Sequence, residues 1–180
     1  MDIKEITNFI TNSAKLLNIK KWDFGASFSN DFSVQVDKGA AKQLKASQKQ
    51  VLTLRVWNNK NLVGITTTSD LSENGLKKAL TQANLASDYG NKNELTDFSP
   101  LAKDPIQNIK KTKRSPSGIR KLLETLRIAE SELLNKHSAI KTIPYNGLSE
   151  SFFKRIYANS DGAQRSYEKS QAAIYLYARA

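Results

Sequence analysis

Few residues of this sequence could do metal or nucleophilic chemistry. The 180 residues include one histidine, His137, and no cysteine. A catalytic zinc ion takes about three protein ligands from histidine, cysteine and carboxylate side chains, and keeps an open position for water or substrate. A motif with two histidines cannot be built from one, and without cysteine there is neither a thiolate ligand nor a disulfide. The sequence therefore predicts no metal-ligating and no catalytic residue in this chain.

The remaining titratable groups also lack a catalytic pattern. We expect His137 to be exposed, or to interact as an imidazolium with the end of the helix before it, where a positive charge is favourable. Three carboxylates of that helix, Glu124, Glu130 and Glu132, are expected to solvate its polar face. No serine or carboxylate has the neighbours of an activated nucleophile. The eight glycines form no phosphate-binding loop ahead of a helix.

The positive charge is concentrated in one segment. The formal net charge is +11, and between Pro100 and Lys121 seven basic residues face one acid, Asp104, for a local net charge of +6. Such a block could contact phosphates or an acidic partner, and it is equally typical of a solvated connector. The candidates for polyanion contact are Lys110, Lys111, Lys113 and Arg114.

The elements before this block are predicted from hydrophobic periodicity. A 3.6-residue period predicts a helix over residues 3–17. Alternation predicts strands over 24–28 and 32–36, with a turn at Ser29-Asn-Asp31 and another at Asp37-Lys-Gly39. Residues 42–49 are expected to form an exposed strand with Leu44 and Ala46 directed inward.

The clearest strand pair comes next. Residues 51–57 alternate strongly, with Leu52, Leu54 and Val56 on one face. A reversal at 58–61 leads to a partner strand over 62–68, rich in β-branched residues. We expect Asp70 to cap the following amphipathic helix and Gly90 to be its C′ residue.

The second half repeats the order of helix and strands. Ser115-Pro116 predicts a helix start with proline at its first position. Residues 151–158 and 164–177 are expected to pair through the turn Asn159-Ser-Asp-Gly162. The fold class is therefore α+β, with two successive helix-plus-antiparallel-sheet halves joined by a basic linker. The predicted divisions are residues 1–90, a linker over 91–117, and 118–180, where an apolar final strand without a turn predicts truncation.

No targeting or membrane signal is visible in the sequence. The N-terminal residues are charged and amphipathic, without the apolar core of a secretory signal. No window approaches the ~20 apolar residues of a membrane span. We therefore expect a cytoplasmic protein that does not contact membranes.

Several motifs together resemble the N-terminal domain of the TldD/PmbA metallopeptidase family, also called modulators of DNA gyrase. The resemblance rests on the order and spacing of Asp31–Lys38, Arg55-Val-Trp57, Leu62-Val-Gly-Ile-Thr-Thr-Thr-Ser-Asp-Leu-Ser72, Gly75-Leu76 and Asn159-Ser-Asp-Gly162. It implies an N-terminal α/β region followed, in full-length members, by a larger β-rich region. The Thr-Thr-Ser-Asp-Leu-Ser stretch is closer to the PmbA branch.

The resemblance also implies a function. The TldD branch carries a histidine-glutamate zinc motif in its later region, whereas the PmbA branch lacks a complete one and pairs with TldD. We therefore expect no cofactor in this chain, with zinc held downstream or in a partner subunit. The expected role is a scaffold and substrate-cavity domain in a homo- or heterodimeric complex that processes peptides. The alternative is a small basic module that binds nucleic acid or an acidic protein.

Overall fold

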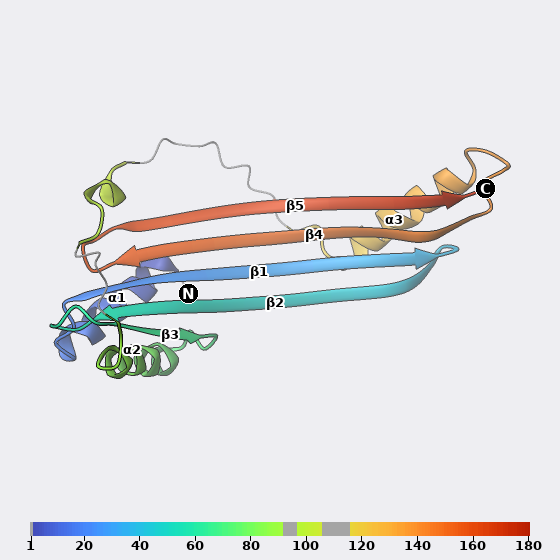
Figure 1. The fold of residues 1–180 in the computed structure, drawn as a ribbon. Helices are drawn as coiled ribbons and strands as arrows, with labels where there is room; N and C mark the ends of the chain where they lie inside the picture. Colours follow the sequence, from blue (N-terminus) through green and yellow to red (C-terminus); the bar gives the residue numbers. More distant parts are fainter. Residues whose placement is uncertain (1, 92–96, 106–115) are drawn as a thin grey trace. The chain divides into compact units, whose positions relative to one another are not determined.

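The structure is a computed structural model, and it describes residues 2–91, 97–105 and 116–180. Figure 1 shows a helix followed by three strands, and then a second helix, a short 3₁₀ helix, a third helix and two strands. The bounds are α1 Ile3–Leu16, β1 Lys21–Asp37, β2 Ala40–Trp57, β3 Val63–Thr68, α2 Glu73–Ser87, η1 Pro100–Lys103, α3 Ile119–Leu134, β4 Thr142–Asn159 and β5 Gln164–Arg179. The predicted α+β class, with helix and antiparallel sheet twice in succession, is confirmed.

The strands form one antiparallel sheet in the order β3-β2-β1-β4-β5. Tight turns connect the long hairpins, and the predicted turn at Gly39 is confirmed, because Lys38 and Gly39 have φ values of 49° and 77°. The predicted Asp-Gly turn is confirmed as well, with Gly162 at φ 92°. In the β2–β3 pair, Arg55 lies opposite Ile65 and Val56 opposite Gly64.

The chain divides into two compact units, and the long strands contribute to both. Unit 1 contains residues 1–28, 49–110 and 154–167, and unit 2 contains residues 29–48, 111–153 and 168–180. The units are discontinuous in sequence because each of β1, β2, β4 and β5 leaves one unit and enters the other. Each unit has its own hydrophobic cluster and is described by itself below.

In unit 1, α1 and α2 cover one face of the sheet. Alternate residues of β1, β2 and β4 supply that face, because successive side chains of a strand point to opposite sides. The helices contribute residues at three- and four-residue spacing. The largest fully buried side chains of this core are Ile6, Ile10, Phe24, Leu52, Leu54, Val56, Leu76 and Leu80.

In unit 2, α3 packs on the sheet through Leu122 and Leu126, which meet Val34 and Val36 of β1 and Leu148 of β4. A buried amide completes the packing. Asn146 accepts a hydrogen bond from the Val36 amide at 2.9 Å and donates one to the Val36 carbonyl at 2.8 Å. The side chain thereby satisfies strand groups that would otherwise lack partners.

Two strand predictions are wrong. The expected turn at 29–31 does not exist, because β1 is continuous through these residues. The even-numbered apolar residues from Phe24 to Val36 keep one alternation across Asn30, which is what a single strand requires. The strand over 42–49 exists within β2, but Leu44 and Ala46 are exposed and not directed inward.

Three helix boundaries differ from the expected ones. Ser72, not Asp70, caps α2, and its side chain accepts a hydrogen bond from the Gly75 amide at 3.2 Å. Asp70 instead accepts from the Ser72 amide at 3.0 Å. Gly90 lies beyond the C′ position, since the C-cap is Asp88. The third helix starts at Ile119 after Gly118, so Pro116 is outside it.

Candidate functional site

The candidate site is the face of unit 1 that α1 and α2 do not cover, and its centre is an ion pair. Asp23 of β1 and Arg55 of β2 lie on this face by strand alternation, since their neighbours Phe24 and Leu54 belong to the core. Arg55 Nε donates to Asp23 Oδ1 at 2.8 Å, and its Nη2 donates to Oδ2. The Asp23 side chain is 2% exposed and the Arg55 side chain 43%. The paired geometry satisfies both carboxylate oxygens of a buried acid.

Tyr157 of β4 extends this network. Its hydroxyl donates to Asp23 Oδ2 at 3.2 Å and accepts from Asn159 Nδ2 at 3.4 Å. Burial raises the pKa of Tyr157 above its ordinary value, with Asp23 adding to the rise. The hydrogen bond to Asp23, opposed by burial, raises the pKa of Arg55. The arrangement therefore holds a neutral phenol and a guanidinium on one carboxylate, with no free base to accept a proton.

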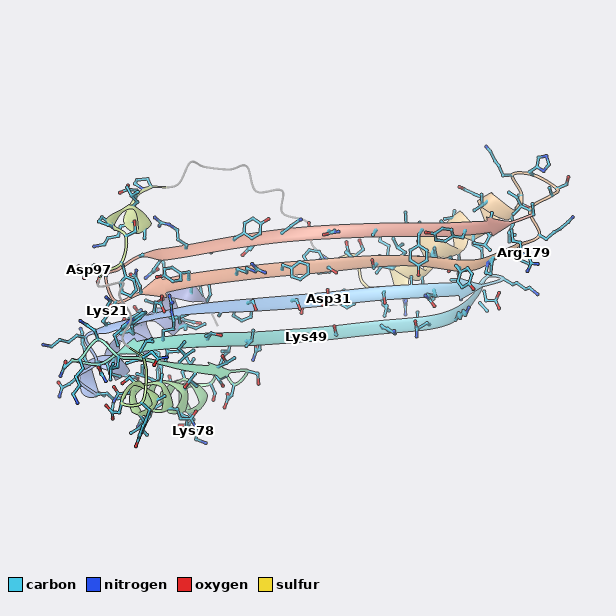
Figure 2. The ribbon with its side chains drawn as sticks, viewed as in Figure 1. Lys21, Asp31, Lys49, Lys78, Asp97 and Arg179 are labelled. Carbon is cyan, nitrogen blue, oxygen red and sulfur yellow. The ribbon has the colours of Figure 1, made fainter. Side chains whose placement is uncertain are left out.

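One end of the network is closed by aromatic rings. The Trp57 ring meets the edge of Phe98 with centroids 5.6 Å apart, and Arg55 lies 5.2 Å from the Trp57 centroid. Lys21 Nζ lies 5.4 Å from Trp57 and 5.3 Å from Phe98; its position on β1 is labelled in Figure 2. These cation–π contacts fix the cations at this end of the face.

Beyond the ion pair the face is hollow. The hollow has a volume of about 610 Å³, and its floor includes Gly25 and Ser27 of β1 and Val51 and Thr53 of β2. A Cβ added at Gly25 would meet nothing within 4 Å, so the space above this glycine is open. The volume lies within the range of roughly 300–1,000 Å³ typical of ligand sites.

Tyrosine and arginine side chains form the other side of the hollow. Tyr157 and Arg155 come from β4, and Arg165 and Tyr167 come from β5. Arg165 donates to the backbone oxygens of Gln164 at 3.0 Å and Asp104 at 2.6 Å. Among the residues that the structure describes, neither an aspartate nor a glutamate lines the hollow. Its positive charge therefore has no carboxylate partner within the lining.

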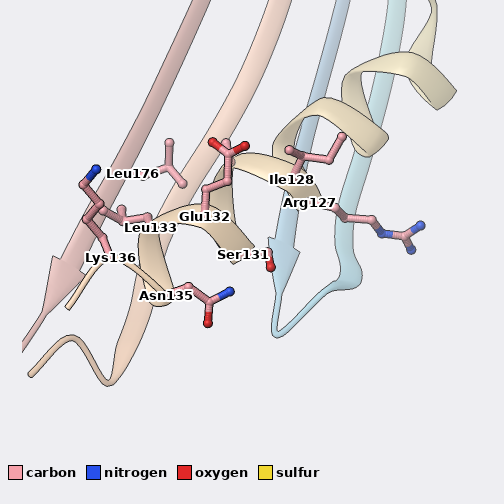
Figure 3. A pocket seen from close by; sticks show the side chains of 9 residues that line it. Arg127, Ile128, Ser131, Glu132, Leu133, Asn135, Lys136 and Leu176 are labelled. Carbon is pink, nitrogen blue, oxygen red and sulfur yellow. The ribbon is translucent and has the colours of Figure 1, made fainter. Parts of the chain in front are cut away.

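Unit 2 has a second hollow, beside the end of α3. Figure 3 shows Arg127, Ser131, Glu132 and Lys136 around it, with Leu176 of β5. Its lining mixes exposed charges of both signs with apolar side chains of α3 and β5. No buried polar group points to a ligand here, so we treat the hollow of unit 1 as the candidate site.

The structure describes some of the residues that the sequence analysis singled out and not others. Lys110, Lys111, Lys113 and Arg114 lie outside the described residues. His137 is exposed just after α3, where its Nδ1 accepts a hydrogen bond from the Ala139 amide at 3.1 Å. Glu124 and Glu132 are exposed as expected, but Glu130 is buried, and its expected solvation was wrong.

Glu130 is buried because it binds the β1–β2 turn of unit 2. Its Oε1 accepts from the Lys38 amide at 3.2 Å and its Oε2 from the Gly39 amide at 2.7 Å. Both donors belong to residues in left-handed conformation, whose amides point the same way out of the turn. The carboxylate is thus structural, and it serves no chemistry.

The donor set does not fit a catalytic metal. Across residues 2–91, 97–105 and 116–180, no group of three or more histidine or carboxylate side chains could hold a metal ion. Within the same residues, no helix is long and apolar enough to cross a membrane. The site can bind and orient a ligand through charge, hydroxyl groups and open backbone.

The fold is an α+β sheet domain, and the uncovered face of its unit 1 carries the ion pair and the hollow. Two family models match in succession: PmbA/TldA metallopeptidase domain 1 over residues 22–86, and PmbA/TldA metallopeptidase central domain over residues 114–180. Together they match most of the chain. The chain belongs to the TldD/PmbA metallopeptidase family, as the motif resemblance predicted.

Solved structures share the fold at low sequence identity. TldE from Thermococcus kodakarensis is 18% identical with a TM-score of 0.74, over 96% of this chain and 38% of its own length. A candidate modulator of DNA gyrase from Thermotoga maritima is 13% identical with a TM-score of 0.68, over 98% and 40%. Another from Bacteroides thetaiotaomicron is 14% identical with a TM-score of 0.72, over 95% and 39%. The chain thus spans about two fifths of their length. A comparison with curated proteins finds no match.

Sequence reasoning missed the network of Asp23, Arg55 and Tyr157. The sequence nevertheless contained a signal for it. Asp23 lies between the core residues Trp22 and Phe24, and strand alternation places its side chain on the face of the sheet away from Phe24. Alternation also places the Arg55 side chain on the face of the sheet away from Leu54. What the sequence did not supply was the β1–β2 and β1–β4 register, which brings the three side chains together.

Proposed function

We propose that this chain is a scaffold and substrate-cavity domain of a TldD/PmbA-type zinc metallopeptidase complex that processes peptides. The observation that carries the proposal is the pair of family matches combined with an uncovered, ligand-sized hollow on unit 1. In this role the sheet face contributes to the wall of a substrate cavity. In this proposal zinc is supplied by residues outside this chain, in a downstream region or in a homologous subunit, as the family resemblance implies.

The proposed partner is a homologous subunit, in a homo- or heterodimer located in the cytoplasm. The chain matches TldE from Thermococcus kodakarensis in fold. The lean toward the non-catalytic PmbA branch follows the Thr-Thr-Ser-Asp-Leu-Ser stretch at 67–72.

The test is reconstitution with a TldD/PmbA-type subunit from the same genome. The two proteins are mixed and analysed by size-exclusion chromatography with light scattering, and the zinc content of each peak is measured. We expect a complex of defined stoichiometry, with zinc in the complex and in the partner but not in this chain alone. Stoichiometric zinc in the isolated chain, or failure of the two to associate at micromolar concentrations, would contradict the proposal.

A second candidate function is polyanion binding by the basic block at 110–114. The observation in its favour is the local net charge of +6 between residues 100 and 121. Binding of this kind weakens steeply with salt, because it releases counterions from the nucleic acid. Retention of a DNA duplex at physiological salt, abolished by neutralising these four side chains, would favour this function over the first.

A further inference from the structure

The floor of the hollow of unit 1 leaves the strand backbone uncovered at Gly25. At Gly25 a Cβ would touch nothing within 4 Å, and its φ is not positive, so no backbone conformation requires glycine there. Glycine in a strand interior is disfavoured by about 0.5–1 kcal/mol relative to alanine. A glycine without a conformational role leaves room for another backbone to approach closely.

The wall of the hollow carries positive charge that the protein does not neutralise. Arg155 is exposed, and among the described residues no ion pair or hydrogen bond involves its side chain. Arg165 is held by two backbone oxygens, which orient its guanidinium without removing its charge. The carboxylate of the neighbouring network, Asp23, is already paired with Arg55. A ligand that matches this site therefore brings its own negative group.

Aromatic and hydroxyl groups lie beside these charges. Tyr167 is 58% exposed on β5, and Tyr157 closes the side nearest the ion pair with its hydroxyl occupied by Asp23. Val51 is 38% exposed on the opposite side. The ligand thus meets an apolar surface and two guanidinium groups within one hollow. A short peptide segment with alternating apolar and acidic side chains complements this combination.

We propose that this hollow binds an extended peptide segment carrying a carboxylate side chain next to an apolar one. The carboxylate pairs with Arg155 and Arg165, and the apolar side chain lies over Gly25 between Val51 and Tyr167. This proposal rests on the proposed function, and it specifies which side chains the peptide substrates of the complex carry. A nucleic acid fits less well, because strands bind along a track of many cations, whereas this hollow offers two.

The test uses a fluorescein-labelled unstructured peptide of alternating glutamate and valine, and its counterpart with glutamine in place of glutamate. Fluorescence anisotropy is measured with the chain and its variants at two salt concentrations. We expect the acidic peptide to bind more tightly than the glutamine peptide by about tenfold or more, since hydrogen bonds to charged groups are among the stronger ones. Arg155→Gln should remove most of that preference.

Two further variants separate binding from folding. A Cβ at Gly25 meets nothing within 4 Å, so Gly25→Leu should place its side chain in the hollow and abolish binding of both peptides, while the melting temperature stays unchanged. Lys78→Gln, an equal charge change at an exposed residue of α2 labelled in Figure 2, should leave binding intact. Loss of binding in Lys78→Gln, or equal affinity for the two peptides, would overturn the proposal.

The outcomes also separate this proposal from the one on which it rests. If the reconstituted complex forms but neither peptide binds, the hollow is not the acidic-peptide site and the scaffold function stands. If the complex does not form and the acidic peptide still binds, the scaffold function fails alone. Tighter binding of a single-stranded oligonucleotide than of the peptide, lost in Arg155→Gln, would assign the hollow to phosphates and overturn the proposal.

Discussion

At the scale of single residues, the ion pair on the open face is asymmetric. Asp23 is almost completely buried, whereas the Arg55 side chain reaches solvent. A buried carboxylate that loses its partner keeps its desolvation cost, but a half-exposed guanidinium can return to water. Removing Arg55 therefore destabilises the fold more than removing Asp23 does. The ion pair with Arg55 explains how β1 tolerates a charged residue between Trp22 and Phe24.

The phenol on this carboxylate makes stability sensitive to alkaline pH. The pKa of Tyr157 in the folded chain lies above its ordinary value of 10.0, so the folded state favours the neutral form. The stabilisation is complete below pH 10 and is lost as the pH rises through the folded pKa, because the unfolded chain releases its proton first. Melting temperatures measured from about pH 8 to pH 12 should fall less steeply in Tyr157→Phe.

The control for this titration is Tyr89, which is 93% exposed. Tyr89→Phe should follow the parent protein across the whole pH range. An alkaline profile that Tyr157→Phe leaves unchanged would mean that the network does not hold the phenol neutral.

The carboxylate of Glu130 allows a sharper test within unit 2. Glu130→Gln replaces one acceptor oxygen with an amide that faces a backbone donor, so one of the two turn amides loses its partner. We expect the free energy of unfolding to fall by about 2 kcal/mol. Chemical denaturation followed by circular dichroism measures the change. Glu132→Gln, an exposed change on the same helix, should have no measurable effect, and equal effects of the two would refute the structural role of Glu130.

At the scale of elements, α2 packs on β3 at a glycine. A Cβ at Gly64 would lie 1.9 Å from the Ala83 carbonyl oxygen and 2.4 Å from the Ser87 amide nitrogen, both backbone atoms of α2. Gly64→Ala should therefore separate helix and strand and lower the free energy of unfolding by about 3 kcal/mol, at the upper end of overpacking costs. Thermal denaturation of the purified variant measures the loss.

Gly25→Ala is the matched control, because it adds the same methyl group to a strand of the same unit in open space. It should leave stability unchanged or raise it by about 0.5 kcal/mol. If both alanine variants had the same stability, the close packing of α2 on β3 would be wrong.

The elements could be predicted where the hydrophobic pattern is local, and less well where tertiary contacts decide. The helix at α1 and the strands at 51–57 and 62–68 follow directly from their periods. The turn predicted at 29–31 is absent because Ser, Asn and Asp allow a turn but do not require one. The neighbouring strands on both sides of β1 keep this segment extended. The cap of α2 moved from Asp70 to Ser72 because Asp70 forms its own side-chain turn with the Ser72 amide.

At the scale of the whole molecule, family and fold class were predictable while the site was not. The ordered motifs at 55–57, 62–72 and 159–162 carried the family assignment, which the matches over 22–86 and 114–180 confirm. The hollow depends on residues from four strands that are distant in sequence. Their adjacency is set by sheet order and register, and one-dimensional patterns specify neither.

The net charge of the molecule distinguishes its two candidate functions. Replacing Lys110, Lys111, Lys113 and Arg114 with glutamine lowers the formal net charge from +11 to +7. Long-range attraction to polyanions follows net charge and its clustering, so the salt concentration that elutes the chain from heparin should decrease. Association with the homologous subunit should persist, because it depends on packed surfaces and not on a diffuse positive field. Loss of subunit association in this variant, with its melting temperature unchanged, would make the basic block the functional surface and refute the scaffold assignment.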